Sequence, residues 1–329
     1  MDWYDKTMRL CLFVLICAVV LRLGTTGFFD PVVGLLTKQE VVEAIWFLET
    51  GRRFPSVDTP VITQPTQPTQ PTETEPTLST QPPTEPTRPL DLWDAGAVQI
   101  NSYCGYEPQV EAWLEQPLEW QLRQSQPTVL ILHSHATESY GESPYRSKDT
   151  AQNMVSIGDL LVQKLEQAGI HVLHDRSLHD GDSYSDAYGN SRASVQKYLQ
   201  EYPGIQLILD IHRDAIADSA GNQLSTTVSG TDIARLMLVV GSDAGGLTHE
   251  RWPENMSLAV KLHARLEQLC PGICRPISFR TQRFNQDLSP GALLVEVGTA
   301  GNTHQQAQNA AVYLAEAIID RASGADGKK

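Results

Sequence analysis

The stretch TVLILHSHATESY, residues 128–140, decides how this chain is interpreted. It begins with the apolar run VLIL, residues 129–132, which is typical of a strand buried on both faces of a parallel sheet. His133, His135 and Glu138 follow directly after that run. Because ligands of open α/β sheets bind just beyond the carboxyl ends of the strands, this stretch predicts a functional site at the edge of a sheet.

Two later stretches repeat the pattern of an apolar strand that carries a polar side chain at or near its end. IQLILDIHRD, residues 205–214, ends in His212 and Arg213. ALLVEVG, residues 292–298, carries Glu296 inside an otherwise apolar run. We therefore interpret the chain as a scaffold that brings three strand ends together around a metal ion.

The polar residues at these strand ends are of the kinds that bind zinc. Zn²⁺ takes histidine nitrogen and carboxylate oxygen, and a catalytic site keeps one coordination position open. His133 or His135, together with Glu138 and His212, supply such a set. If the first strand continues, His133 and His135 lie on the same face, and only one of them needs to bind the metal. Two alternatives to a zinc site stay open. His133 and His135 could be ordinary loop histidines, and His212 could belong to a structural salt-bridge cluster.

Glu296 is a carboxylate in the middle of an apolar strand. Burying such a group without a partner is expensive, so its pKa should rise. A raised pKa suits a general base that acts on a metal-bound water. The alternative is a structural glutamate paired with Arg213 or Arg283.

The other histidines lie in no comparable context, and we expect them at the surface or in loops, with His179 and His249 as possible groove residues. Five cysteines form no CxxC pair, and the pairing of Cys270 with Cys274 stays open. The remaining histidines of the globular part are His171, His174, His263 and His304.

Strands and helices alternate from residue 129 to residue 322, which predicts an α/β domain with a mostly parallel, twisted sheet flanked by helices. A lead-in with a strand and a short helix precedes it, within 92–119. The expected strands are 129–132, 170–173, 205–211, 224–227, 234–240, 277–279 and 292–297. The expected helices are 153–168, 191–202, 255–270 and 305–322.

Composition excludes several classes of protein. The 329 residues carry a net charge of −14, which argues against nucleic acid as a partner because phosphate binding needs a basic surface. A hydrophobic content of 41% and a mean hydropathy of −0.26 indicate a globular protein rather than a polytopic membrane protein.

The first 90 residues predict an anchor and a spacer. The apolar run 10–21 follows Lys6 and Arg9, and it fits either a cleaved signal peptide or an uncleaved anchor. We favour a single-pass anchor within 1–30 in the cell membrane, with the rest of the chain on the extracytoplasmic side. Residues 31–54 should form a juxtamembrane helix.

Residues 55–90 repeat QPT and EPT triplets, which cannot bury enough apolar surface to fold and favour an extended, disordered linker. The catalytic domain should then occupy 91–323, followed by a disordered tail at 324–329.

With these residues collected, the chain resembles the stage II sporulation protein P family of endospore-forming bacteria. The matching segments are LHSHATESY, LDIHRDA, RFNQDLSPGALLVEVG and, at 301–303, GNT. The resemblance implies a zinc-dependent N-acetylmuramoyl-L-alanine amidase fold and hydrolysis of peptidoglycan at the sporulation septum and during engulfment. Some members are credited with cleaving peptide cross-links as well. The stage II sporulation proteins D and M are the partners that it implies.

Carried over by position, the resemblance implies that His133 or His135, Glu138 and His212 hold zinc and that Glu296 is the catalytic glutamate. In the broader superfamily the carboxylate ligand opens the helix after the first strand. That helix begins here near Asn153, so Glu138 or Glu142 would have to reach the metal from a loop. Arg213, Arg283, Asn285 and Asp287 are expected to line the substrate groove.

Two other functions remain open at this point. The chain could be a catalytically silent wall-binding scaffold of the engulfment machinery, although the retained histidines and Glu296 argue against it. It could also be a zinc carboxypeptidase that acts on peptide ends.

Overall fold

The computed structural model describes residues 97–118 and 120–322. The expected anchor, juxtamembrane helix and linker lie outside the described residues, as does the expected tail at 324–329. Within the described part of the chain, no helix is both long and apolar enough to cross a membrane. Cys104, Cys270 and Cys274 are free thiols, so the open question of a Cys270–Cys274 disulfide is answered in the negative.

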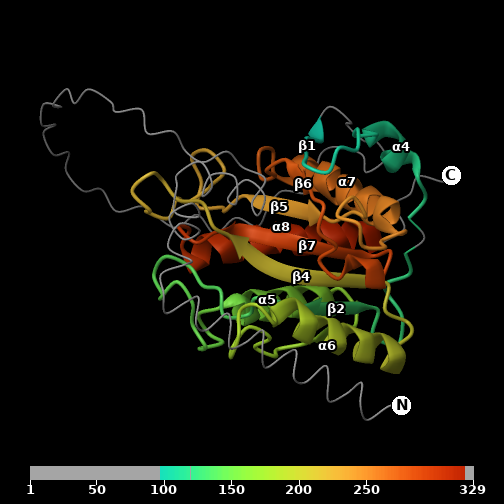
Figure 1. Cartoon of the computed structure of the whole chain (residues 1–329), viewed down its shortest axis with the longest axis horizontal. Coiled ribbons are helices and arrows are strands. Elements are labelled where there is room, and N and C mark those ends of the chain that lie inside the picture. The colour runs from blue at the N-terminus through green and yellow to red at the C-terminus, as the bar shows by residue number, and fades with distance from the viewer. Residues whose placement is uncertain (1–96, 119, 323–329) are drawn as a thin grey trace, which may run out of the picture. The chain divides into compact units, whose positions relative to one another are not determined.

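A seven-stranded sheet forms the centre of the domain, in the order β1-β6-β5-β7-β4-β2-β3 (Figure 1). Every neighbouring pair is parallel except β5 and β7, which are antiparallel. The α/β class is therefore confirmed, but the sheet is mixed. Its strands are β1 (Ile100–Ser102), β2 (Val129–Leu132), β3 (Val172–His174), β4 (Leu207–Asp214), β5 (Leu236–Val240), β6 (Ile277–Phe279) and β7 (Ala292–Thr299).

All expected helices are present, with shifted ends. The expected strand at 224–227 is absent: Thr227 makes only an isolated bridge with Ala234, and the Asn302 side chain holds the backbone of Thr226. The helices are α4 (Val110–Glu115), α5 (Met154–Gln167), α6 (Ala187–Glu201), α7 (Trp252–Leu269) and α8 (His304–Ala322), with a short 3-10 turn, η2 (Gln286–Leu288).

Local sequence explains where helix α5 begins and ends. The Asn153 side chain accepts a hydrogen bond from Val155 N at 3.0 Å, which satisfies a free N–H of the first turn. Gly169 follows the last turn with a φ of +77°, a conformation that glycine adopts without a steric cost. The helix is thereby fixed directly beneath the end of β2.

The two faces of the sheet bury different sets of residues. Helices α5, α7 and α8 cover one face, where alternate residues of β4 such as Leu207, Leu209 and Ile211 join the main core. Helix α6 covers part of the other face, where Ile208 packs with Val195 in a smaller cluster. Because side chains alternate along a strand, every residue of β4 and β7 is assigned to one face or the other.

The starts of β4 and β7 are held close together at Gly291. A Cβ atom at this position would overlap the carbonyl oxygen of Gln206, the residue before β4. This contact sets the spacing of the two strands that carry His212 and Glu296.

We expect Gly291→Ala to lower the free energy of unfolding by roughly 1–3 kcal/mol, because the backbone must shift to admit the methyl group. Gly189→Ala is the matched control. Its Cβ would meet nothing within 4 Å, and it lies in helix α6, so it should be neutral or stabilising by up to about 1 kcal/mol. Urea unfolding measures both, and a Gly291→Ala protein as stable as the wild type would contradict the close contact.

Candidate functional site

The carboxyl ends of β2, β4 and β7 meet at one edge of the sheet. In the β4–β7 ladder, His212 is the register partner of Glu296. Both residues alternate with core residues of the α5 face, so strand parity places them on the α6 face. Asp210 lies two residues before His212 and shares that face. The structure therefore brings together two of the residues that the sequence singled out, and adds Asp210.

His212 lies between two carboxylates. Its Nε2 is 2.8 Å from Asp210 Oδ1, and its Nδ1 is 3.5 Å from Glu138 Oε2. Burial lowers the pKa of His212, but the negative charge and hydrogen bonds of Asp210 and Glu138 together raise it well above its ordinary value. A positive charge at this position is therefore stabilised, whether it is carried by a proton or by a metal ion.

Asp210 connects the ends of β2 and β4. Its Oδ1 accepts a hydrogen bond from Ser134 N at 2.7 Å, and its Oδ2 accepts one from Ser134 Oγ at 2.6 Å. These bonds, together with the contact to His212, lower the pKa of the Asp210 carboxyl against the opposing effect of burial. The sequence pattern singled out His212 but not Asp210, although the spacing of two residues between them was the available signal.

Glu138 is buried and held by Arg213. The Arg213 backbone N–H donates to Glu138 Oε2 at 3.3 Å, and Arg213 Nη1 lies 3.6 Å from Glu138 Oε1. The Arg213 guanidinium also donates to Ser139 O and Tyr145 O and lies over the Tyr145 ring. Arg213 was expected beside the substrate groove, but it is 3% exposed, so it cannot line a groove and instead orients Glu138.

His135 reaches the same cluster from the turn after β2. Its ring stacks on Tyr184 at 4.1 Å between centroids and lies 5.5 Å from the His212 ring. Its Nδ1 is buried, 3.7 Å from Asp180 Oδ2, and has no hydrogen-bond partner in the part of the chain that the structure describes. Asp180 is itself held by the backbone and hydroxyl of Thr137.

His133 lies on the opposite face of the sheet. Strand β2 ends at Leu132 and a turn occupies 134–137, so the expectation that both histidines share a face is wrong. His133 Nδ1 is 3.0 Å from Ile211 O, and its Nε2 is 2.9 Å from His174 Nε2. Burial, with a further contribution from His174, lowers the pKa of His133 to about 3. His133 therefore belongs to the α5 side, where a side chain at Gly158 would collide with both rings.

The motif RFNQD, residues 283–287, is hydrogen-bonded to helix α6. Asn285 has a φ of 58°, in the left-handed region that asparagine tolerates, and its amide donates to Tyr188 O at 2.9 Å. Asp287 accepts two hydrogen bonds from Arg192, at 2.8 and 2.7 Å, and Arg283 lies 3.3 Å from Asp287. The contacts between this motif and helix α6 position Tyr188, whose ring centroid lies 5.4 Å from that of His135.

Several histidines that we expected at the surface are buried. His174 pairs with His133, and His179 hydrogen-bonds Asp175. His249 and His263 are 1% and 2% exposed, and no described residue hydrogen-bonds to their ring nitrogens. The residues next to these histidines in the sequence do not predict that they are buried. Their burial results from the packing of loops and helices.

The cluster contains donors of the right kinds for zinc. His135, Glu138 and His212 are two imidazoles and one carboxylate, and the unpartnered His135 Nδ1 is a donor available for a ligand. As the side chains of residues 97–118 and 120–322 lie, no three His, Cys, Asp or Glu groups converge on a single point. Glu142 is not part of the cluster, since its carboxylate accepts a hydrogen bond from the backbone of His304.

Glu296 faces this cluster with an unsatisfied carboxylate oxygen. Its side chain is partly exposed, but Oε2 is buried and has no hydrogen-bond partner within 97–118 and 120–322. Burial raises the pKa of Glu296 to about 8, and the negative charge of Asp214 contributes to the same effect. Neither Arg213 nor Arg283 forms an ion pair with Glu296 among the described contacts; they pair with Glu138 and Asp287.

Comparison with known proteins identifies the family by sequence. The family described as Stage II sporulation protein P (SpoIIP) matches residues 58–319. The Stage II sporulation protein P of Bacillus subtilis (strain 168) is 30% identical over 209 residues, which is 58% of this chain and 50% of that protein. The chain thus spans about half the length of that relative.

Solved structures show more distant similarity. N-acetylmuramoyl-L-alanine amidase AmiC2 of Nostoc punctiforme is 18% identical, with a TM-score of 0.36 over 60% of this chain and 96% of that one. An N-acetylmuramoyl-L-alanine amidase of Clostridium difficile 630 is 14% identical, with a TM-score of 0.39 over 61% and 98%. The CwlD amidase of Clostridioides difficile, solved in complex with the GerS lipoprotein, is 15% identical, with a TM-score of 0.38 over 60% and 98%.

The raised pKa of Glu296 predicts a pH-dependent stability difference between the metal-free wild type and Glu296→Gln. The folded protein holds the Glu296 proton more tightly than the unfolded chain does, so the contribution of Glu296 to stability is complete below about pH 4.5. It is lost as the pH rises toward about 8. Glutamine does not titrate, so the variant should gain stability relative to the wild type across that range, by at most about 1.4 kcal/mol per pH unit.

Calorimetry at several pH values after removal of metal by a chelator measures this difference. A stability difference that stays constant from pH 4.5 to 8 would show that Glu296 is not a buried carboxyl of raised pKa.

Proposed function

The chain belongs to the Stage II sporulation protein P family, and from this premise we propose that it is a peptidoglycan hydrolase. The reaction proposed is that of a zinc-dependent N-acetylmuramoyl-L-alanine amidase, which cuts the amide bond between muramic acid and the stem peptide. The observation that carries the proposal is the buried group of His135, Glu138 and His212 on the same face of the sheet as Glu296. A purely structural salt bridge would not leave Glu296 Oε2 and His135 Nδ1 unpartnered.

We assign the metal ligands as His135, Glu138 and His212. A zinc ion bound there supplies a Lewis acid, a water of lowered pKa and a positive charge beside Glu296. His133 is excluded from the set because its two ring nitrogens engage Ile211 O and His174 on the opposite face. Asp210 orients the His212 ring through Nε2, which leaves Nδ1 directed toward Glu138.

Glu296 acts as the general base and then as the general acid. It accepts a proton from the attacking water and delivers it to the amine of the departing L-alanine. Its position in a ladder between β4 and β5 keeps the carboxylate fixed relative to His212. The free Oε2 has no internal hydrogen bond to break before it can take the proton.

The family membership also supports proposals on biological context. We assign the protein a role in thinning the septal wall and in engulfment during endospore formation, with the stage II sporulation proteins D and M as partners. A single-pass anchor would place the catalytic domain on the extracytoplasmic side of the cell membrane, where peptidoglycan is found.

Metal content distinguishes the two histidines after β2. We expect His135→Ala and His212→Ala to lose bound zinc, while His133→Gln, which keeps a donor and an acceptor between Ile211 and His174, should retain about one zinc ion per chain. Elemental analysis and circular dichroism of the three folded variants measure this. Loss of zinc in His133→Gln with retention in His135→Ala would reverse the assignment.

Turnover distinguishes a catalytic from a structural Glu296. We expect Glu296→Gln to bind zinc and sacculi normally while cleaving peptidoglycan roughly 10²–10⁴-fold more slowly, because the amide cannot accept the water proton. Release of new L-alanine amino groups from purified sacculi, with and without chelator, measures the reaction. Normal release by a zinc-loaded variant would remove Glu296 as the base, and no release by the wild type would favour the silent scaffold.

A further inference from the structure

A pocket of about 290 Å³ lies at the opposite end of the sheet from the candidate site. Its lining includes Ile205 and Gln206, which precede β4, and Pro290 and Gly291, which precede β7. The candidate site lies at the carboxyl ends of the same two strands. The pocket is therefore separated from it by the length of the strands, and nothing in the proposed reaction uses it.

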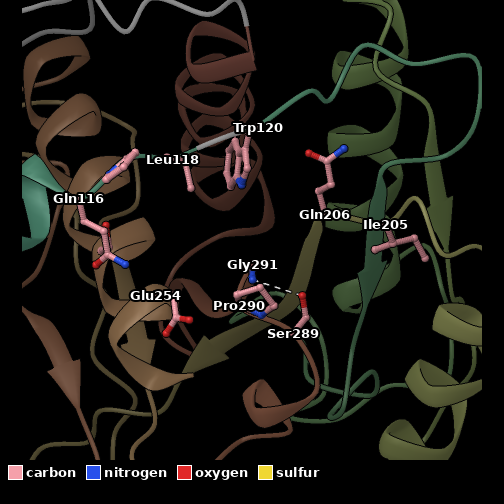
Figure 2. A pocket seen from close by; sticks show the side chains of 11 residues that line it. Gln116, Leu118, Trp120, Ile205, Gln206, Glu254, Ser289, Pro290 and Gly291 are labelled. Carbon is pink, nitrogen blue, oxygen red and sulfur yellow. Dashed lines mark hydrogen bonds between the residues drawn. The ribbon is translucent and has the colours of Figure 1, made fainter. Parts of the chain in front are cut away.

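The lining mixes apolar and polar side chains, with one aromatic ring and one charged group. Figure 2 shows Trp120 and Leu118 directed from one segment toward Pro290, with Glu254 to one side and Gln206 to the other. Glu254 is the one charged residue among those that line the pocket.

Two of the polar lining residues are already bonded within the protein. The Gln206 amide exchanges hydrogen bonds with the backbone of Gln121, and the Ser257 hydroxyl donates to Trp113 O. The pocket therefore presents to a ligand an apolar surface of tryptophan, proline and leucine side chains beside one carboxylate. Grooves of this composition bind proline-rich segments in the polyproline II conformation, which loses little entropy on binding.

This chain carries such a segment upstream of the described residues. The sequence PTETEPTLSTQPPTEPTRPL, residues 71–90, contains six prolines. Arg88 is the single basic residue between positions 55 and 90, where four residues are acidic. In a docked segment Arg88 would pair with Glu254, which Arg251 Nε already contacts at 3.4 Å, while Glu73, Glu75 and Glu85 give residues 71–90 a net charge of −2.

Only a short stretch of sequence separates the segment from the domain that holds the pocket. Nine residues lead from Arg88 to Ala97, the first described residue, and span about 28 Å at roughly 3.1 Å per residue. The longest strands of the sheet have eight residues, or about 26 Å. Tethering also raises the effective concentration of the segment to the order of millimolar, so weak affinity suffices for binding.

We propose that the proline-rich segment 71–90 of this chain docks in the pocket formed by Trp120, Leu118, Pro290 and Glu254. Docking would fix the spacer to the end of the domain opposite the catalytic edge. The spacer would then run from this end of the domain to Ala97, which precedes β1 at the end of the sheet that carries the catalytic edge, and it would position the domain as well as tether it.

Photo-cross-linking of the full chain in detergent tests this proposal. A photoreactive amino acid in place of Gln116, which lines the pocket, should cross-link within the same molecule to a peptide from 71–90, identified by mass spectrometry. The same amino acid in place of the exposed Leu224, which is not part of the pocket, is the matched control and should not give this product.

Second-site variants then identify the contacts. Trp120→Ala should lower the cross-link yield at least ten-fold, as expected for a central aromatic anchor. Glu254→Arg, a surface change that leaves the core intact, should lower it up to about five-fold, and Arg88→Glu combined with Glu254→Arg should restore it.

Four results would overturn the proposal. The first two are equal cross-link yields from positions 116 and 224, and cross-link yields that neither pocket variant changes. The third is a cross-linked product that joins two differently isotope-labelled molecules. The fourth is loss of the product when soluble muropeptides are added and are themselves captured at position 116. The last result would assign the pocket to the wall polymer instead.

Discussion

The hydrogen bonds of the buried Asp210 carboxylate hold the candidate site together. One oxygen accepts from Ser134 N and contacts His212 Nε2, and the other accepts from Ser134 Oγ. Since β2 ends at Leu132, these bonds connect β2 and β4 beyond the last backbone pairing, where the chain turns to deliver His135. A side chain without an oxygen acceptor at position 210, such as alanine, would leave the Ser134 backbone and His212 without this common partner.

The carboxylates at this edge of the sheet differ in pKa and therefore in function. Asp210 and Glu138 have lowered pKa values because each contacts His212, and Glu138 also lies beside Arg213. Glu296 is on the same face but has no ion-pair partner among the described residues, and burial raises its pKa to about 8. Two carboxylates are thus favoured as anions, while the third can exchange a proton near neutral pH. Environments that push pKa values apart in this way are typical of acid–base catalytic sites.

Aromatic side chains form the outer wall of the cluster and depend on distant segments. Tyr188 comes from the start of α6, where Asn285 of the RFNQD motif holds its backbone. Tyr184 stacks on His135, with the guanidinium of Arg146 over its ring. Arg146 in turn pairs with the buried Asp180. The geometry of His135 therefore depends on the loop after β3 as well as on its own strand.

The sequence alone determined the α/β class, the position of most elements and the candidates Glu138, His212 and Glu296, because apolar runs and strand periodicity are local properties. It did not determine that β5 runs against β7, since strand order depends on how distant segments pair. It also did not determine which histidine of HSH faces the site. That choice depends on where β2 stops pairing, and on the space that Gly158 of α5 leaves for His133 and His174 on the other face. Arg213 shows the same limit, because its burial against Glu138 and Tyr145 results from tertiary contacts that no local pattern encodes.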